Sequence, residues 1–299
     1  MDAHTHAFPS VEMGDDWQRV PGLPTPTRTG ELGELTELMA RGGIGRAVIL
    51  LFPRSAEHYR ALLSEPGGAE REDEIRERIK QEIYDYNRWG VAAARAEPRL
   101  LAFIGVNPRF LSESEITAEI DAMAAAGAAG VKIIPPAMGL YADDPLLQPV
   151  YQRASALRLP VLSQSGDGFL PPPAPGRDHF GRPRYHGHNL ANFPRLTLIL
   201  AHLGHGYSDD VVELAGRYDN LYTDTSFQLG LLDQPGEFNR VQMADLFRRI
   251  GVERVLLGSN FPMVDPIEYV HALQSLPLSS AEHDLVGFGN ARRALGLTA

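Results

Sequence analysis

Eight short apolar runs, rich in β-branched residues, recur along the chain with longer helix-like stretches between them. Most runs are continuously apolar rather than alternating, which is typical of parallel strands that are covered on both faces. The runs span residues 1–7, 46–52, 100–107, 130–135, 159–165, 196–202, 220–226 and 254–260, and the first of them is weak by composition. Eight strands alternating with helices over 299 residues predict an α/β fold, a single (β/α)₈ TIM barrel spanning residues 1–299.

Besides the helix-like stretches, the chain has two long segments that fit neither a strand nor a helix pattern. Helices are expected at residues 31–41, 72–96, 114–126, 145–157, 209–217, 241–250, 266–273 and 281–295. Asp144 and Pro145 form a plausible start to one helix, and Ser114 is a candidate cap for another. Residues 9–29 and 166–183 are expected to be long loops at the C-terminal face of the barrel, and the proline-rich second loop is expected to cover or wall the site.

The amino-acid composition argues against several classes of function. The 28 basic and 38 acidic residues give a net charge of −10, which argues against nucleic acid and anionic membranes as partners. The chain has no cysteine, so any metal must be held by histidine nitrogen and by oxygen. No apolar run reaches about 18 residues and no secretory signal is visible, so a cytoplasmic location is expected.

His4 and His6 stand two residues apart near the end of the first predicted strand. Side chains alternate along a strand, so both imidazoles project to the same face. At the mouth of a barrel, two such imidazoles can chelate one cation. The alternative is a histidine pair on the surface, and the position at the end of strand one favours the site.

Two other polar residues lie in strands that are predicted to be buried. His202 ends the apolar sixth strand and is the candidate acid/base residue, with the less certain His205 just beyond it. Lys132 interrupts the fourth strand in a chain that has only two lysines, Lys80 and Lys132. Lys132 either points into the mouth, where it could bind an anion or a carbonyl oxygen, or extends its ammonium to solvent from the strand end; the sequence leaves both open.

Polar residues also end the remaining strands. Gln164, Asp224 and Asn260 are placed at the ends of strands five, seven and eight. Arg54 follows strand two and could meet a substrate carboxylate. Arg177 lies in the expected loop 166–183 and is a further candidate for binding substrate.

Together these motifs resemble the amidohydrolase-2 branch of the amidohydrolase superfamily. The resemblance covers nearly the whole chain and rests on Asp-x-His-x-His at 2–6, Gly-Val-Lys-Ile at 130–133, Ala-His-Leu-Gly at 201–204, Asp-Thr-Ser at 224–226 and Gly-Ser-x-x-Pro at 258–262. That branch includes aminocarboxymuconate-semialdehyde decarboxylase, resorcylate decarboxylases and the pyrone-dicarboxylate lactonase. The resemblance implies hydrolysis or decarboxylation of a small carboxylated or carbonyl-bearing substrate.

Two positions depart from the family pattern. Gln164 stands where the family has a metal-binding histidine, and Asn260 stands where it has a metal-binding aspartate. Amide oxygens are poorer ligands for transition metals, and an asparagine is not a general base at neutral pH. We therefore expect no cofactor, or a weakly held Zn²⁺ or Mn²⁺ on His4 and His6. The resemblance allows this, because the family's lactonase is metal-independent.

Two hypotheses follow. The first is an enzyme in which His202, Lys132, Asp224 and Asn260 carry the chemistry. Its substrate-binding residues are Arg54, Gln164, His205 and Arg177. The second is a catalytically inactive or repurposed barrel that binds a small ligand or a partner; the changes at Gln164 and Asn260 favour it, whereas retention of the histidines favours the enzyme. The expected partners are a small-molecule substrate and, by analogy with the family, a second copy in a homodimer.

Overall fold

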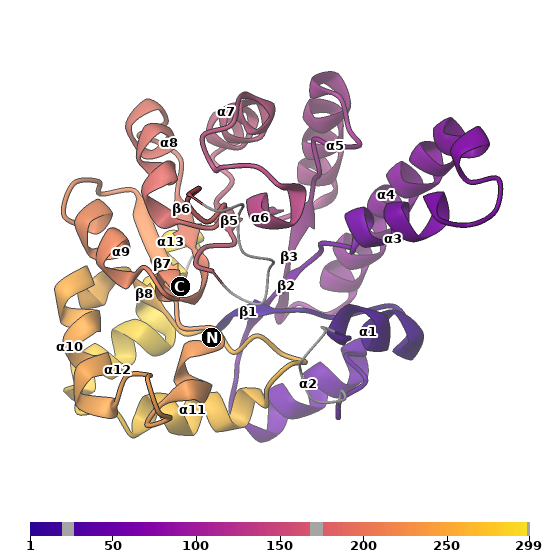
Figure 1. Cartoon of the computed structure of the whole chain (residues 1–299). Helices are drawn as coiled ribbons and strands as arrows, with labels where there is room; N and C mark the ends of the chain where they lie inside the picture. Colours follow the sequence, from indigo (N-terminus) through magenta and orange to yellow (C-terminus); the bar gives the residue numbers. More distant parts are fainter. Residues whose placement is uncertain (20–26, 168–175, 298–299) are drawn as a thin grey trace.

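The computed structural model describes residues 1–19, 27–167 and 176–297, and it contains an eight-stranded parallel sheet. The strands follow one another around the sheet in chain order, each hydrogen-bonded to the next, and helices surround them (Figure 1). This is the predicted (β/α)₈ TIM barrel. The strands are β1 (Asp2–Thr5), β2 (Ala47–Leu50), β3 (Leu100–Gly105), β4 (Gly130–Ile133), β5 (Val161–Ser163), β6 (Leu198–Leu200), β7 (Leu221–Asp224) and β8 (Val255–Leu256).

The helices confirm most of the expected segments. They are α1 (Val11–Gln18), α2 (Leu32–Arg41), α3 (Ser55–Leu63), α4 (Glu72–Ala96), α5 (Glu113–Ala126), α6 (Pro135–Met138), α7 (Gln148–Leu157), α8 (Gly187–Asn192), α9 (Ser208–Ala215), α10 (Arg240–Ile250), α11 (Pro266–Gln274), α12 (Ser280–Asp284) and α13 (Asn290–Ala294). None of the helices in the described part of the chain is long and apolar enough to cross a membrane.

Four helices, α1, α3, α6 and α8, fall where none was expected. Helix α1 lies within residues 9–29, which were predicted to be a loop. Ser10 starts this helix, because its side chain accepts a hydrogen bond from the Met13 amide. All four helices have nine residues or fewer, so each offers little periodic pattern. The central part of the predicted covering loop, residues 168–175, lies outside the described residues, so the prediction that 166–183 covers the site stays a prediction.

The two predicted helix starts have different outcomes. Asp144 caps as expected, accepting from the Leu146 amide at 2.9 Å, although the turn that follows is a 3₁₀ helix that leads into α7. Ser112 caps α5 instead of the predicted Ser114. Ser112 and Glu115 hydrogen-bond each other's backbone amides, and this reciprocal arrangement satisfies two free N–H groups at the helix start.

The barrel closes through backbone hydrogen bonds between β1 and the segment that starts with β8. The Ala3 amide donates to the Leu257 carbonyl at 2.7 Å, and the Asn260 amide donates to the His4 carbonyl at 2.8 Å. This closure fixes the end of β8 beside the end of β1. As a consequence, Asn260 and His4 are neighbours although 256 positions separate them in the sequence.

The inward and outward faces of β4 show how the barrel positions Lys132. Val131 and Ile133 pack in the apolar layer between the strands and the helices. Lys132 alternates with them and pairs in register with Leu162, which belongs to the apolar cluster inside the barrel. Lys132 therefore faces the barrel interior and is 1% exposed. The alternative, in which its ammonium reaches solvent from the strand end, is wrong.

The role of Asp2 in closing the barrel between β1 and the segment after β8 can be tested by substitution. Its carboxylate accepts from the His4 amide at 3.1 Å and from the Ser259 amide at 2.9 Å. We predict that Asp2→Ala lowers the free energy of unfolding by about 1–3 kcal/mol, because two buried amides lose their acceptor. Urea denaturation measures this change.

Asp2→Asn is the matched control, because it keeps an acceptor oxygen and removes the buried charge. Burial raises the pKa of Asp2 to about 6, so the native protein holds its proton more tightly than the unfolded chain does. The wild type should therefore lose stability relative to Asp2→Asn as the pH rises from about 4 through 6. Equal stability of all three proteins would contradict the role of Asp2 in closure.

Candidate active site

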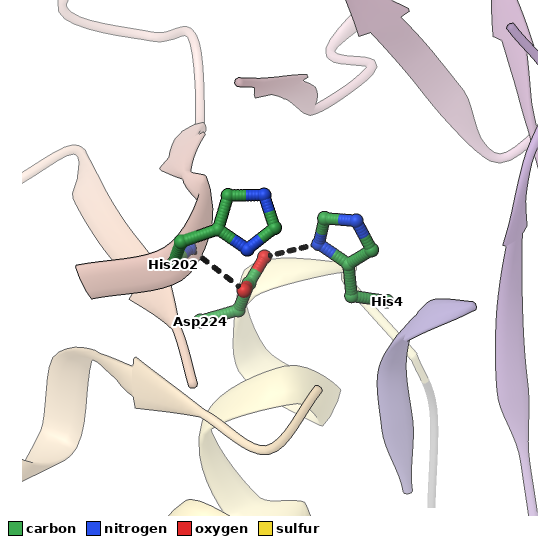
Figure 2. Close-up of side chains that lie close together, drawn as sticks. All are labelled: His4, His202 and Asp224. Atoms are coloured by element: carbon green, nitrogen blue, oxygen red, sulfur yellow. Dashed lines mark hydrogen bonds and ion pairs between the residues drawn. The ribbon is translucent and has the colours of Figure 1, made fainter. Parts of the chain in front are cut away.

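The centre of the candidate site is a hydrogen bond between His4 in β1 and Asp224 at the end of β7. His4 Nδ1 lies 2.8 Å from Asp224 Oδ2, and both side chains are buried. The other oxygen of Asp224 accepts from the backbone amides of His202 at 3.1 Å and Ser226 at 3.0 Å. Figure 2 shows Asp224 between the two imidazoles. One carboxylate thus joins three strand ends.

The charge state of this pair follows from its contacts. Burial opposes ionisation of Asp224, but the nearby His4 and His202 and the hydrogen bonds from His4 and Ser226 outweigh it and hold the pKa of Asp224 below its usual value. Burial also lowers the pKa of His4. The pair is therefore a carboxylate that accepts the Nδ1 proton of a neutral imidazole, which leaves the lone pair of His4 on Nε2.

His6 lies beside His4, with the two ring centroids 5.3 Å apart. Its Nδ1 is 3.1 Å from the carbonyl oxygen of Leu50, so this nitrogen carries the proton and Nε2 carries the lone pair. The indole of Trp17, on α1, packs against the other side of the ring at 4.1 Å between centroids. The two predicted histidines are thus both buried at the end of β1, and α1 covers one of them.

His202 sits in a short turn after β6 whose backbone has a positive φ of 62°. This conformation is uncommon for a residue with a side chain, and the Asp224 carboxylate stabilises it by accepting the His202 amide. The ring centroids of His202 and His4 lie 5.0 Å apart. Burial lowers the pKa of His202 to about 3. The buried imidazole is therefore neutral at neutral pH.

Two groups hold the His202 ring. Nε2 lies 2.9 Å from Gln164 Oε1, and Nδ1 lies 2.7 Å from the Ser226 hydroxyl and 3.0 Å from the Ser226 carbonyl oxygen. The same hydroxyl lies 3.0 Å from His4 Nδ1 and contacts the Asp224 carboxylate. A neutral His202 ring has one N–H, so it donates either to Gln164 through Nε2 or to Ser226 through Nδ1, and the Ser226 hydroxyl can donate to Nδ1 only in the first case.

The Gln164 side chain contacts His202 Nε2, and the Asn260 backbone amide donates to the His4 carbonyl oxygen. Both residues are partly exposed, whereas His4, His6, His202 and Asp224 are buried. This partly exposed side of the cluster is called its opening. Amides can donate to a substrate oxygen, and they cannot deliver the negative charge that a carboxylate would supply at the same place.

Lys132 adds a cation to the same interior. Its Nζ is buried and has no hydrogen-bond partner among the described residues. Its charge lowers the pKa of His4, His6 and His202, and the Asp224 charge favours its protonation in return. Burial is the larger effect and lowers the pKa of Lys132 to about 7.

The other predicted residues do not join this cluster. Arg54 donates to the carbonyl oxygens of Asp16 at 2.7 Å and Arg19 at 3.2 Å, so it binds the end of α1. His205 Nδ1 contacts the Gln228 side chain, and its Nε2 is 3.7 Å from Asp167. Arg177 is exposed. Their roles in substrate binding stay predictions.

Sequence reasoning missed Ser226 and Trp17. Ser226 belongs to the Asp-Thr-Ser motif at 224–226 that contributed to the resemblance, yet no role was given to its hydroxyl. Trp17 lies in the segment that was interpreted as a loop. A helix start at Ser10 was the available signal, since Ser favours that position.

The ligand atoms that these side chains offer indicate whether the site suits a metal ion. His4, His202 and Asp224 each offer one ligand atom, and these atoms lie within 4.8 Å of one another. However, Asp224 already hydrogen-bonds His4 through one oxygen and Ser226 and the His202 amide through the other. The positive charge of Lys132 acts on the same imidazoles. These residues fit a closed hydrogen-bond network better than a tightly held divalent cation.

Comparison with known proteins identifies the family. A family model described as amidohydrolase matches residues 1–297. The chain belongs to this family and is an enzyme of the amidohydrolase superfamily, as the motifs indicated. A search of curated proteins gave no match.

Solved structures share the fold at low sequence identity. An uncharacterized TIM-barrel protein from Bordetella bronchiseptica is 20% identical, with a TM-score of 0.71 and coverage of 99% of this chain and 98% of the other. The 5-carboxyvanillate decarboxylase from Sphingomonas paucimobilis is 16% identical, with a TM-score of 0.67 and the same coverage. A dihydroxybenzoic acid decarboxylase from a Polaromonas species, with bound manganese and the inhibitor 2-nitroresorcinol, is 14% identical, with a TM-score of 0.69 and coverage of 99% and 96%.

The attachment of α1 yields a pH-dependent test. His58, on α3, lies 2.9 Å from Asp16 on α1 and 3.1 Å from Glu82 on α4. The hydrogen bond to Glu82, with that to Asp16, raises the pKa of His58 to about 9. A raised histidine pKa stabilises the fold fully below the unfolded value near 6.5, and the effect is lost as the pH rises through 9. We predict that the urea midpoint falls between pH 6.5 and 9.5, and falls less in His58→Gln.

His283→Gln is the matched control, because that histidine lies outside this contact. Trp17 fluorescence in a Trp89→Phe background reports whether α1 loosens over the same pH range. An unchanged difference between wild type and His58→Gln from pH 6.5 to 9.5 would contradict the contact.

Proposed function

We propose that this protein is a hydrolase or decarboxylase that acts on a small carboxylated or carbonyl-bearing compound without a tightly held metal ion. The observation that carries the proposal is the neutral, buried His202 held between Gln164 and Ser226 beside the Asp224–His4 pair. An imidazole in this state is able to accept a proton and return it during one reaction cycle.

The substrate class is supported by charge and by the similar structures. Lys132 places a buried cation in the interior of a chain with net charge −10, and a buried cation favours an anionic or carbonyl oxygen. Two of the similar structures are named as decarboxylases of carboxyvanillate and dihydroxybenzoic acid. Both names describe carboxylated compounds.

Each residue at the opening has a proposed task. The Lys132 ammonium binds the carboxylate or carbonyl oxygen, and the amides of Gln164 and Asn260 hydrogen-bond the oxygen that gains charge. Asp224 keeps the proton of His4 on Nδ1 and holds the backbone of His202. Arg54, His205 and Arg177 are retained as candidates for contacts farther from the reacting atoms, which a larger substrate would reach.

A barrel that only binds a ligand is the second candidate function. The neutral amides at Gln164 and Asn260 favour it, because they replace the two strongest ligands of the family's site. The intact network around His202 favours catalysis, and turnover separates the two candidates.

We predict that His202→Asn lowers turnover by about 10²–10⁴-fold, the range that a general acid–base residue contributes. Turnover is measured by mass spectrometry of hydroxybenzoates, keto acids and lactones incubated with the protein. Asn retains a polar side chain near Gln164, so the fold should persist. Lys80→Met is a matched control far from His202 in the chain. Activity of His202→Asn near that of wild type would remove the proposed role.

We predict that metal analysis finds well under one equivalent of zinc or manganese after dialysis, and that turnover persists in chelator. The double variant Gln164→His with Asn260→Asp should instead retain about one equivalent, because it restores an imidazole and a carboxylate at the opening. One equivalent of tightly held metal in the wild type would contradict the metal-independent proposal. A double variant without metal would contradict the alignment of these two positions.

A further inference from the structure

We propose that Lys132 is a nucleophile that forms a covalent imine with a substrate ketone, and that the substrate is an acid whose carbonyl group is β to its carboxylate. This inference rests on the proposed function, because it uses the same opening and the same class of carboxylated carbonyl compound. It goes beyond electrostatic binding, because it assigns a covalent step to the lysine.

The first support is the position of the amine. Lys132 faces the barrel interior from β4, next to the inward Leu162, and its Nζ has no hydrogen-bond partner in the described part of the chain. Leaving a buried ammonium without a partner costs several kcal/mol. An amine in this position is therefore built to be neutral or to meet a ligand.

Lys80, the other lysine of the chain, is paired with carboxylates and serves as a comparison for Lys132. Its Nζ lies 2.8 Å from Glu77 and 2.9 Å from Glu115, and these carboxylates raise its pKa. Lys132 has the opposite environment, because its Nζ is buried without a hydrogen-bond partner among the described residues, and burial outweighs the nearby Asp224 charge and lowers its pKa to about 7. Near neutral pH a large fraction of Lys132 is the free amine, which is the form that attacks carbonyl carbon.

The chemical steps balance without an added oxidant, reductant or cofactor. The Lys132 nitrogen adds to the ketone carbon and the C=O π bond breaks. The oxygen gains one proton that the nitrogen loses and a second proton from solvent, and it then leaves as water, so an iminium ion forms. The bond between the α-carbon and the carboxylate then breaks. Carbon dioxide leaves, and the electron pair moves through the α-carbon to the iminium nitrogen and gives an enamine. Protonation of the α-carbon and addition of water release the ketone and the lysine.

The neighbouring groups fit the proton transfers that these steps need. His202 is neutral and can take the proton that the amine loses on addition and give it to the departing oxygen. Its low pKa makes the resulting imidazolium a strong acid, which favours the return of the proton. The partly exposed Gln164 and Asn260 stand at the opening, where their amides would hold the carboxylate until it leaves.

The experiment traps the imine on the full-length protein. Acetoacetate is added with sodium cyanoborohydride, which reduces an iminium to a stable secondary amine, and peptide mapping by mass spectrometry locates the adduct. The chain has only two lysines, so the map distinguishes Lys132 from Lys80 without ambiguity. Acetylacetone is the second probe, because a β-diketone forms an enaminone with a free amine that absorbs in the near ultraviolet.

We expect one adduct per chain on Lys132, little on Lys80, and an enaminone band that Lys132→Met abolishes and Lys80→Met leaves unchanged. Lys132→Arg keeps a cation but cannot form the imine, so it should lose decarboxylation as Lys132→Met does. Circular dichroism checks the fold of each variant, and the adduct on wild type tests the inference if a variant fails to fold.

Adducts confined to Lys80 or to the N-terminus, or full activity in Lys132→Arg, would overturn the imine. In that event, loss of activity in His202→Asn would still support the proposed function. Conversely, an adduct on Lys132 in a protein that turns over no carboxylated compound would overturn the proposed function and the decarboxylation together, while the reactive amine would stand.

Discussion

The buried carboxylate of Asp224 is the interaction on which the rest of the site depends. A fully buried charge is costly unless it is paired and hydrogen-bonded. Asp224 meets this requirement through His4 Nδ1 and the backbone amides of His202 and Ser226. Because these partners come from β1, the turn after β6 and the end of β7, the carboxylate fixes their relative positions. It also fixes the tautomer of His4 and stabilises the unusual backbone of His202.

The second consequence is a site whose cation belongs to the protein itself. His4, His6 and His202 are buried with lowered pKa values, so they are neutral bases. Lys132 is the one lysine inside the barrel, and it shares this interior with the Asp224 carboxylate. With neutral amides at Gln164 and Asn260, Asp224 is the one carboxylate among these residues.

Helix α1, whose Trp17 packs on His6, is attached by contacts outside the barrel. Trp17 packs on His6, and its helix α1 is held by Arg54 through backbone carbonyls and by His58 through Asp16. Arg54 was predicted to bind substrate, yet its guanidinium is engaged with α1. The contact between His58 and two carboxylates therefore links the attachment of α1 to the protonation of His58.

The sequence by itself determined the barrel, because eight apolar runs separated by helices have few other ways to bury both faces of a parallel sheet. Local pattern was also enough to place His4 and Lys132 in strands and His6 and His202 just after strands. Tertiary structure alone decided the rest. The hydroxyl of Ser226 gains its role only where β1, β6 and β7 meet, and the packing of Trp17 requires a short helix with little periodic signal. The lowered pKa values of His202 and Lys132 arise from burial among residues that are far apart in the chain, which no local pattern records.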